Sequence, residues 1–248
     1  MVADLIRSSK YVQVIGVDNV LNKVLDPLQV GYMSAKSLDA SLKVCPKADA
    51  AEKVGVVCKK NGIYDIVEYS EISEEDCTRK AEDGSLFLEL GSILIFMLSS
   101  EKLLSLASNT ETLNQLYHVA HKKLEFWDEN QQKTVKPDTE NGYKFELFLH
   151  NFLSFIKQGE FGAIKVIRED EFGPVKNADG AATDTPTIAR ELMQKQHARW
   201  LAANVGDKFD GKTVEIDLLR SYDGDFAQGF TDIVSSIDID GQDSIYIQ

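Results

Sequence analysis

The feature that most limits how this chain folds is a β-hairpin signature at Asn61-Gly62. Runs rich in Val, Ile and Tyr flank this dipeptide in the stretch GVVCKKNGIYDIVEYSEI. Asn-Gly supplies the positive φ angles of a tight type I′ turn, whose twist matches that of paired strands. Because strand side chains alternate, Glu68 shares a face with Tyr64 and Ile66. A carboxylate there is either solvated at a rim, as most strand carboxylates are, or it holds a polar ligand.

Strand-like and helix-like segments alternate along the rest of the chain. YVQVIGVDN at 11–19 resembles the buried strands of parallel sheets, and AIKVI at 163–167 predicts another strand. Helices are predicted at 3–8, 27–41, 103–123, 143–158 and 185–204. This alternation predicts an α/β fold with a mixed sheet. We expect one large unit at 1–206 and a small β-rich appendage at 207–248.

Composition narrows the class of protein. The formal net charge of −13 argues against a general nucleic-acid binder, which needs a basic face, but allows a local site for one small anion. The longest apolar stretch, 93–98, is far shorter than the ~20 residues that span a bilayer, so we expect no membrane segment. Three cysteines without a C-x-x-C pair indicate reduced thiols and a cytoplasmic protein.

Asp18 is the first candidate site residue. It follows a predicted strand, and ligands of open α/β sheets collect at the carboxyl ends of strands. A carboxylate there holds Mg²⁺ well, because this ion prefers oxygen ligands and also contacts substrate phosphates. The alternative is a turn or helix-cap residue, with about equal weight.

Two lysines are candidate anion ligands. Lys176 lies in the loop REDEFGPVKNAD, where Pro174 restricts the backbone and helps to aim one ammonium group. Lys144 lies in the first turn of the predicted phenylalanine-rich helix, whose free amides attract anions. The alternatives are a solvated charged loop for the first and a surface lysine for the second. The sequence has no Ser-His-Asp signature and no glycine-rich phosphate loop.

Several long blocks, taken in order, resemble the eukaryotic UDP-N-acetylglucosamine pyrophosphorylases. These blocks are VQVIGVDNVLNKVLDP, VGVVCKKNGIYDIVEYSEI, KPDTENGYKFELFLHNF, REDEFGPVKNAD and TPTIARELM. The resemblance runs from about Tyr11 to Gly206. It implies a mixed sheet of the nucleotide-diphospho-sugar transferase (Rossmann-like) type, incomplete at the N-terminus.

The activity that this resemblance implies is a uridylyl transfer. UTP and N-acetylglucosamine 1-phosphate give UDP-N-acetylglucosamine and pyrophosphate, by in-line attack of the sugar phosphate on the α-phosphorus. By the same resemblance, Asp18 corresponds to the Mg²⁺ ligand, Lys144 to a contact of the nucleotide phosphates and Lys176 to a contact of the sugar phosphate. We therefore expect Lys144 and Lys176 to be the catalytic cations.

The resemblance also implies a sugar site, with departures. Gly55, Glu68 and Tyr69 match sugar-contacting positions, where a carboxylate accepts hydrogen bonds from hydroxyl groups. Ser92 stands where the family usually has asparagine. Of two aromatic residues that line the family's N-acetyl pocket, one corresponds to Phe148 and the other is replaced by His150. The sugar is therefore less firmly implied than the reaction.

The family's triphosphate loop and uridine-binding residues lie in an N-terminal half that would precede Met1. We therefore expect this chain to be a fragment that is inactive alone and needs the missing half or a partner chain. One alternative is a non-catalytic module of the same fold that binds a partner protein. Another keeps the chemistry with a different sugar, such as UDP-glucose or UDP-N-acetylgalactosamine.

Overall fold

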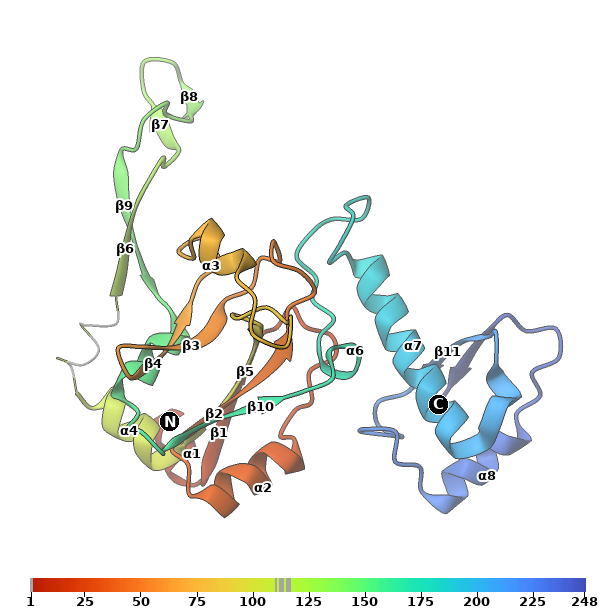
Figure 1. Cartoon of the computed structure of the whole chain (residues 1–248). Coiled ribbons are helices and arrows are strands. Elements are labelled where there is room, and N and C mark those ends of the chain that lie inside the picture. The colour runs from red at the N-terminus through yellow and green to blue at the C-terminus, as the bar shows by residue number, and fades with distance from the viewer. Residues whose placement is uncertain (1, 110, 112–113, 115–116) are drawn as a thin grey trace.

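The computed structural model describes residues 2–109, 111, 114 and 117–248, with a six-stranded mixed sheet at the centre (Figure 1). Its strands are β1 (Tyr11–Ile15), β2 (Ala40–Pro46), β3 (Val56–Lys60), β4 (Ile63–Val67), β5 (Leu90–Ser99) and β10 (Phe161–Lys165). They run in the order β10-β2-β5-β3-β4, and β1 pairs with β5. β10 is parallel to β2, whereas the other pairs are antiparallel, which confirms the predicted mixed sheet.

The predicted hairpin is confirmed, and the first predicted strand needs a correction. Asn61 and Gly62 have φ angles of 54° and 82°, as a type I′ turn requires. β1 ends at Ile15, and its side chains are half-buried except for the exposed Ile15. It runs antiparallel to β5, so it is not the buried parallel strand that its β-branched residues predicted. β-branched residues indicate a strand, but they do not identify its neighbours.

Both faces of the sheet are covered. On one face, Phe96 of β5 and Leu42 of β2 pack with Phe152, which belongs to the 3₁₀ helix η1 (Leu149–Phe155). On the other face, Met97 packs with Met33 of α2 (Pro27–Lys36). Alternation along each strand puts successive side chains on opposite faces, so β2 and β5 are buried on both sides.

The predicted helices begin where capping residues mark their first turn, as in α2 and α7. Their bounds are α1 (Val2–Arg7), α2, α3 (Glu74–Thr78), α4 (Ser100–Ala107), α6 (Arg168–Glu171), α7 (Pro186–Val205) and α8 (Gln228–Ser236). The hydroxyl of Thr185 caps α7 by accepting from the amide of Ile188. α2 ends at Lys36, because Ser37 adopts a left-handed φ of 51°. The predicted extension of this helix to residue 41 is wrong, since β2 begins at Ala40.

Two helix predictions are wrong over much of their length. The segment predicted as a helix at 103–123 begins in α4, which ends at Ala107. Residues 110, 112–113 and 115–116 lie outside the described part, and residues 117–122 form the strand β6 (Tyr117–Lys122). The predicted phenylalanine-rich helix is β9 (Gly142–Leu147) followed by η1. Phe145 pairs across the ribbon with Val119. The spacing of Phe145, Phe148 and Leu149 is that of one helix face. Phe145 is nevertheless in a strand, because it pairs with Val119, which is 26 positions away in sequence.

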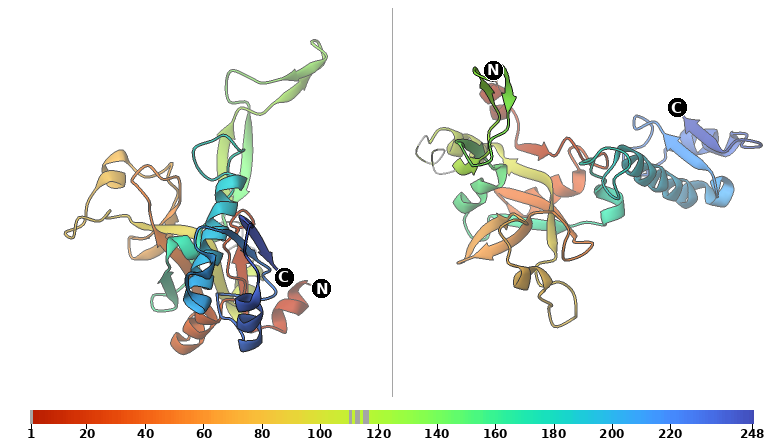
Figure 2. Two further views of the ribbon diagram at one scale, coloured as in Figure 1. Left: turned by 90° about the vertical axis from the view of Figure 1, so that its right-hand side faces the viewer. Right: turned by 90° about the horizontal axis from the view of Figure 1, so that it is seen from above.

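The β6–β9 ribbon projects from the body, and β7 (Phe126–Asp128) and β8 (Lys133–Val135) lie beyond it (Figures 1 and 2). The C-terminal elements form a second core. β11 (Thr213–Ile216) runs parallel to β12 (Ser244–Ile247), and α8 and the short helix η2 (Gly206–Phe209) pack beside them. Leu201 of α7 also belongs to this core. The division at residue 206 stays a prediction, because the end of α7 packs with the C-terminal elements. Within the described residues, every helix is too short or too polar to cross a membrane.

Candidate functional site

The turn after β1 and the loop after α6 lie against each other. The amide of Val175 donates to the carbonyl of Asp18 at 2.8 Å, and the amide of Val20 donates to the carbonyl of Gly173 at 3.1 Å. Between them, Asn19 and Pro174 form an isolated antiparallel bridge. The backbone therefore carries Asp18 and the segment just before Lys176 side by side.

The side chain of Asn19 strengthens this junction. It is 4% exposed. Its amide nitrogen donates to the carbonyl of Glu171 at 2.7 Å, and its oxygen accepts from the amide of Gly173 at 2.8 Å. Buried polar groups need such partners, so one side chain satisfies backbone groups on both sides of Phe172. The backbone amide of Lys176 is held separately, by the carbonyl of Asp184 at 2.8 Å.

A pocket of about 210 Å³ opens beside this junction. Six of the eight residues that the sequence predicted for the site line it: Asp18, Gly55, Glu68, Tyr69, Ser92 and Lys176. The other lining residues are Lys53, Val54, Ile66, Ile93, Leu94, His150 and Phe172. The hairpin, β5 and the two loops thus contribute to one cavity, although they are far apart in sequence.

Gly55 makes room for the carboxylate of Glu68. A Cβ atom on Gly55 would lie 2.7 Å from Cγ2 of Ile66 and 3.5 Å from Oε1 of Glu68. The first distance is too short for two carbon atoms, so a larger residue would push the buried Ile66 or Glu68 away. The carbonyl of Gly55 also accepts from the amide of Ser92 at 2.8 Å, which joins the hairpin to β5.

Glu68 and His150 form the polar wall of the pocket. Burial and the nearby carboxylate of Glu71 raise the pKa of Glu68, while Lys176 opposes this effect. Burial lowers the pKa of His150, although Asp65 and Glu71 oppose it. His150 Nδ1 lies 3.9 Å from Glu68 Oε1, but a neutral imidazole forms no ion pair there. Glu68 therefore keeps oxygen lone pairs available for a ligand.

Leu94 is a lining residue that the sequence did not indicate. The ladder between β2 and β5 shifts register after Lys43, and Leu94 adopts a left-handed φ of 56°. Its side chain is exposed toward the pocket, and its carbonyl accepts from the amide of Gly16 at 3.0 Å. Bulges and left-handed residues other than glycine are concentrated at functional sites. No local sequence signal identifies such a bulge in an apolar run.

Lys144 and Phe148 do not line the pocket. Lys144 lies on β9, where its Nζ is 2.6 Å from Oε1 of Glu146. The helix N-terminus expected to support Lys144 is absent, since residues 142–147 form a strand. Phe148 precedes η1 and stacks on His150 with ring centroids 5.3 Å apart. Phe148 therefore contacts the polar wall through His150, and the roles expected for Lys144 and Phe148 stay predictions.

The first part of the predicted charged loop is a short helix, because Arg168–Glu171 form α6. Arg168 donates to both carboxylate oxygens of Glu52, at 2.5 and 3.2 Å, and Glu171 is buried. The Nζ of Lys176 lies over the ring of Phe172, 5.8 Å from the ring centroid. The sequence drew attention to this loop for Lys176 alone, because nothing in it identifies the distant partners of Arg168 and Glu171.

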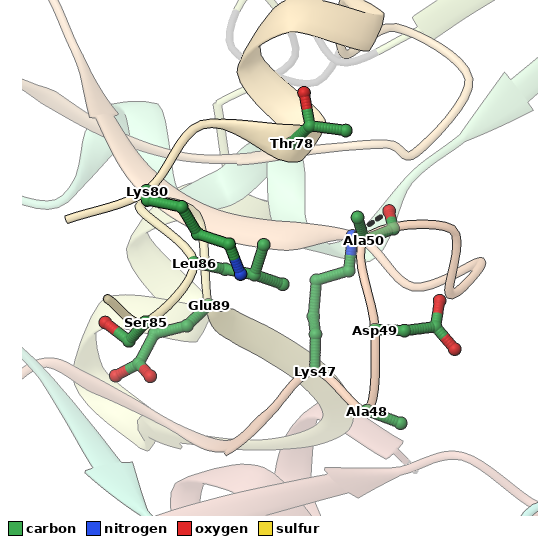
Figure 3. Close-up of a pocket in the computed structure, with 9 residues that line it drawn as sticks. All are labelled: Lys47, Ala48, Asp49, Ala50, Thr78, Lys80, Ser85, Leu86 and Glu89. Atoms are coloured by element: carbon green, nitrogen blue, oxygen red, sulfur yellow. Dashed lines mark hydrogen bonds between the residues drawn. The ribbon is translucent and has the colours of Figure 1, made fainter. Parts of the chain in front are cut away.

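A larger pocket of about 490 Å³ lies elsewhere and contains none of the predicted residues (Figure 3). Lys47 and Lys80 are its cationic residues. The Nζ of Lys47 donates to the carbonyl of Ala50 at 3.0 Å, and Glu89 on its rim pairs with Lys165. Lys47 and Glu89 are thus paired within the chain, and the pocket lacks the predicted residues, so the smaller pocket is the better candidate.

The donor set for a metal is small. In the described ranges, no group of three or more His, Cys, Asp and Glu residues could hold an ion. Asp18 is half-buried, and a Cβ on Gly16 would lie 2.9 Å from its Oδ1, so glycine leaves space beside this carboxylate. One carboxylate suits Mg²⁺, which often binds through one or two carboxylates, several waters and substrate phosphates.

Comparisons with known proteins identify one family of similar chains. A family model described as UTP–glucose-1-phosphate uridylyltransferase matches residues 1–241. The chain is 42% identical over 208 residues to UDP-N-acetylhexosamine pyrophosphorylase-like protein 1 of Xenopus tropicalis, covering 84% of the chain and 40% of that protein. It is 34% identical over 219 residues to UDP-N-acetylglucosamine pyrophosphorylase of Saccharomyces cerevisiae, covering 88% of the chain and 46% of that protein.

A solved structure is similar over the whole chain. The crystal structure of the uridine diphosphate N-acetylglucosamine pyrophosphorylase from Trypanosoma brucei in complex with inhibitor matches with a TM-score of 0.83 and 29% identity. The match covers 100% of this chain and 50% of that one. The predicted nucleotidyltransferase-type fold is therefore confirmed. The chain spans half or less of the length of the proteins it matches here.

Proposed function

The chain belongs to the UTP–glucose-1-phosphate uridylyltransferase family, and from this membership we propose that it is the sugar-phosphate-binding part of a UDP-N-acetylglucosamine pyrophosphorylase. The complete reaction joins UTP and N-acetylglucosamine 1-phosphate into UDP-N-acetylglucosamine and releases pyrophosphate. The observation that carries this proposal is that Asp18, Glu68 and Lys176 line one pocket.

Each of these side chains suits one part of a sugar phosphate. The ammonium group of Lys176 attracts the phosphate, and Glu68 accepts hydrogen bonds from sugar hydroxyls. Asp18 would hold Mg²⁺, which supplies charge neutralisation at the phosphates. In-line attack of a phosphate oxygen on the α-phosphorus needs no covalent intermediate, so positioning and charge account for the rate.

A binding experiment tests the proposal on this chain alone. We expect titration calorimetry with N-acetylglucosamine 1-phosphate and Mg²⁺ to show binding that Lys176→Ala weakens at least tenfold. Lys157→Ala is the matched control, because this exposed lysine lies outside the pocket. Absence of binding to a folded sample, or equal affinity for both variants, would contradict the proposal.

Turnover needs a second experiment, since the chain spans less than half of two curated relatives. We expect pyrophosphate-dependent formation of UTP from UDP-N-acetylglucosamine only when the chain is combined with the part of these relatives that it does not cover. Such an assay with Lys144→Ala also tests the expected contact of Lys144 with the nucleotide. We further propose the cytoplasm as the compartment, which fractionation of the source cells would test.

One observation favours a second candidate. Lys144, expected at the nucleotide phosphates, lies on the ribbon and away from the pocket. A non-catalytic module that binds sugar phosphates or a partner protein would have no need of this contact. The sugar is a separate question, since His150 lines the pocket where the family has an aromatic residue. A panel of UDP-glucose, UDP-N-acetylgalactosamine and UDP-N-acetylglucosamine distinguishes these substrates.

A further inference from the structure

A largely buried cluster of charges includes Glu171, the residue before Phe172 of the pocket. Lys43 of β2 is completely buried, and its Nζ forms ion pairs with Asp26 at 2.5 Å and with Glu171. Glu171 and Asp26 are 6% and 5% exposed. Lys23 extends the cluster, with Nζ 3.7 Å from Glu171 and 2.7 Å from Asp223. We call these five residues the charge cluster.

Stability alone is a weak reason for such a cluster. Removing charges from water costs free energy that the ion pair only partly recovers, and apolar side chains of similar volume often serve a fold equally well. Ile95 of β5 lies directly opposite Lys43 in the sheet and is apolar and buried, so a long apolar side chain would suit this position. The position that the ion pairs give to Glu171 is therefore a better reason for the charge cluster than stability.

The charge cluster joins the two segments that carry pocket residues. Asp26 and Lys23 follow Asp18 in the same segment, and Glu171 precedes Lys176 by five positions. The carboxylate of Glu171 is held by Lys43, while its backbone carbonyl accepts from Asn19. Glu171 thus connects the buried sheet to the junction at which the two segments meet.

We propose that Lys43 and Glu171 are positioning residues, which set the separation between the carboxylate of Asp18 and the ammonium group of Lys176. This inference rests on the proposed function, in which Asp18 and Lys176 act on the same sugar phosphate. A cation and a metal ligand that share one phosphate must be held at a defined distance, and a displacement of about 1 Å can cost about a hundredfold in rate. Neither Lys43 nor Glu171 lines the pocket, so both act through the backbone.

The charges can be removed without emptying the core. The double variant Lys43→Met with Glu171→Leu, made together with Asp26→Asn so that no buried carboxylate loses its lysine, replaces the pair by apolar side chains of similar length. We expect it to fold, as circular dichroism would verify, and to bind N-acetylglucosamine 1-phosphate with Mg²⁺ at least tenfold more weakly. We also expect faster hydrogen exchange at the amides of Gly173 and Val175, which hold the junction. Exchange at β5 should stay unchanged.

Lys165→Met with Glu89→Leu is the matched control. This pair is also a lysine and a glutamate, 2.8 Å apart, but it lies outside the pocket and the charge cluster. We expect the control to keep both the affinity and the exchange rates. If the double variant unfolds, Glu171→Gln keeps the shape and removes one charge, and the same two measurements apply to it.

The two proposals fail in different ways. If the unchanged protein does not bind the sugar phosphate, the proposed function is wrong, and the exchange of Gly173 and Val175 still decides whether the pair positions the junction. If a folded variant binds normally and exchanges normally, the positioning role is wrong and the proposed function stands.

Discussion

The amide of Val175 donates a hydrogen bond to the carbonyl of Asp18 at 2.8 Å, across 157 positions of sequence. This bond places a carboxylate that follows the first strand beside the loop that carries Lys176. A candidate metal ligand and a candidate phosphate ligand therefore share one wall of the pocket. We make four predictions about this junction, the pocket beside it and the charge cluster.

Asn19→Ala should destabilise the fold. The variant leaves the carbonyl of Glu171 and the amide of Gly173 without their partner, and a buried polar group without a partner costs about 1–3 kcal/mol. We expect the free energy of unfolding, measured in urea, to fall by about 2 kcal/mol or more. Asn130→Ala, at an exposed turn, should change it by less than about 0.5 kcal/mol. Equal effects of the two variants would show that the junction contributes little.

Gly55→Ala should weaken ligand binding. The new methyl group would lie 2.7 Å from Ile66 and displace either that core residue or the carboxylate of Glu68. We expect at least a tenfold loss of affinity for N-acetylglucosamine 1-phosphate in calorimetry. Gly31→Ala is the control, since Gly31 lies in α2 with no atom within 4 Å of the added Cβ. It should leave binding unchanged and stabilise the helix by about 0.5–1 kcal/mol.

Binding should weaken in acid because of Glu68. Burial raises its pKa above the ordinary value of 4.5, so the carboxylate becomes protonated at a higher pH than an exposed glutamate. A protonated Glu68 loses acceptor capacity for sugar hydroxyls. We expect the affinity of the unchanged protein to fall as the pH drops toward this raised pKa. Glu68→Gln should bind weakly with a flatter pH profile, and identical profiles would contradict the role of this carboxylate.

Asp26 should make the fold sensitive to stronger acid. Burial alone would raise its pKa, but hydrogen bonds from Lys43 and from the amide of Leu28, together with the charges of Lys43 and Lys23, lower the pKa below 3.8. A lowered pKa contributes stability above the unfolded value, and this contribution disappears as the pH falls through the folded value. We expect urea unfolding of Asp26→Asn to depend less on pH below about 4 than that of the unchanged protein. Parallel pH dependence of both proteins would contradict this.

Local chemistry explains why parts of the fold were predictable. The turn at Asn61-Gly62 and the start of α7 at Thr185-Pro186 depend on backbone angles and caps within a few residues. The predicted helices over 103–123 and 143–158 are wrong at 117–122 and 143–147, because Phe145 pairs with Val119, a contact that no nearby residue indicates. The spacing of apolar residues can fit both a helix and a strand, and a pairing partner far away in sequence then determines which one forms.

In the candidate site, too, some properties follow from the sequence and others only from the tertiary structure. The sequence by itself, through residue types and resemblance, determined that Asp18, Glu68 and Lys176 are of the kind that bind a metal, a sugar and a phosphate. The tertiary structure alone decided that these three share a cavity, that Lys144 lies outside it, and that Leu94 borders it. The physical reason is range: turns, caps and alternation act between near neighbours, whereas burial, ion pairing and cavity shape arise only where distant segments meet.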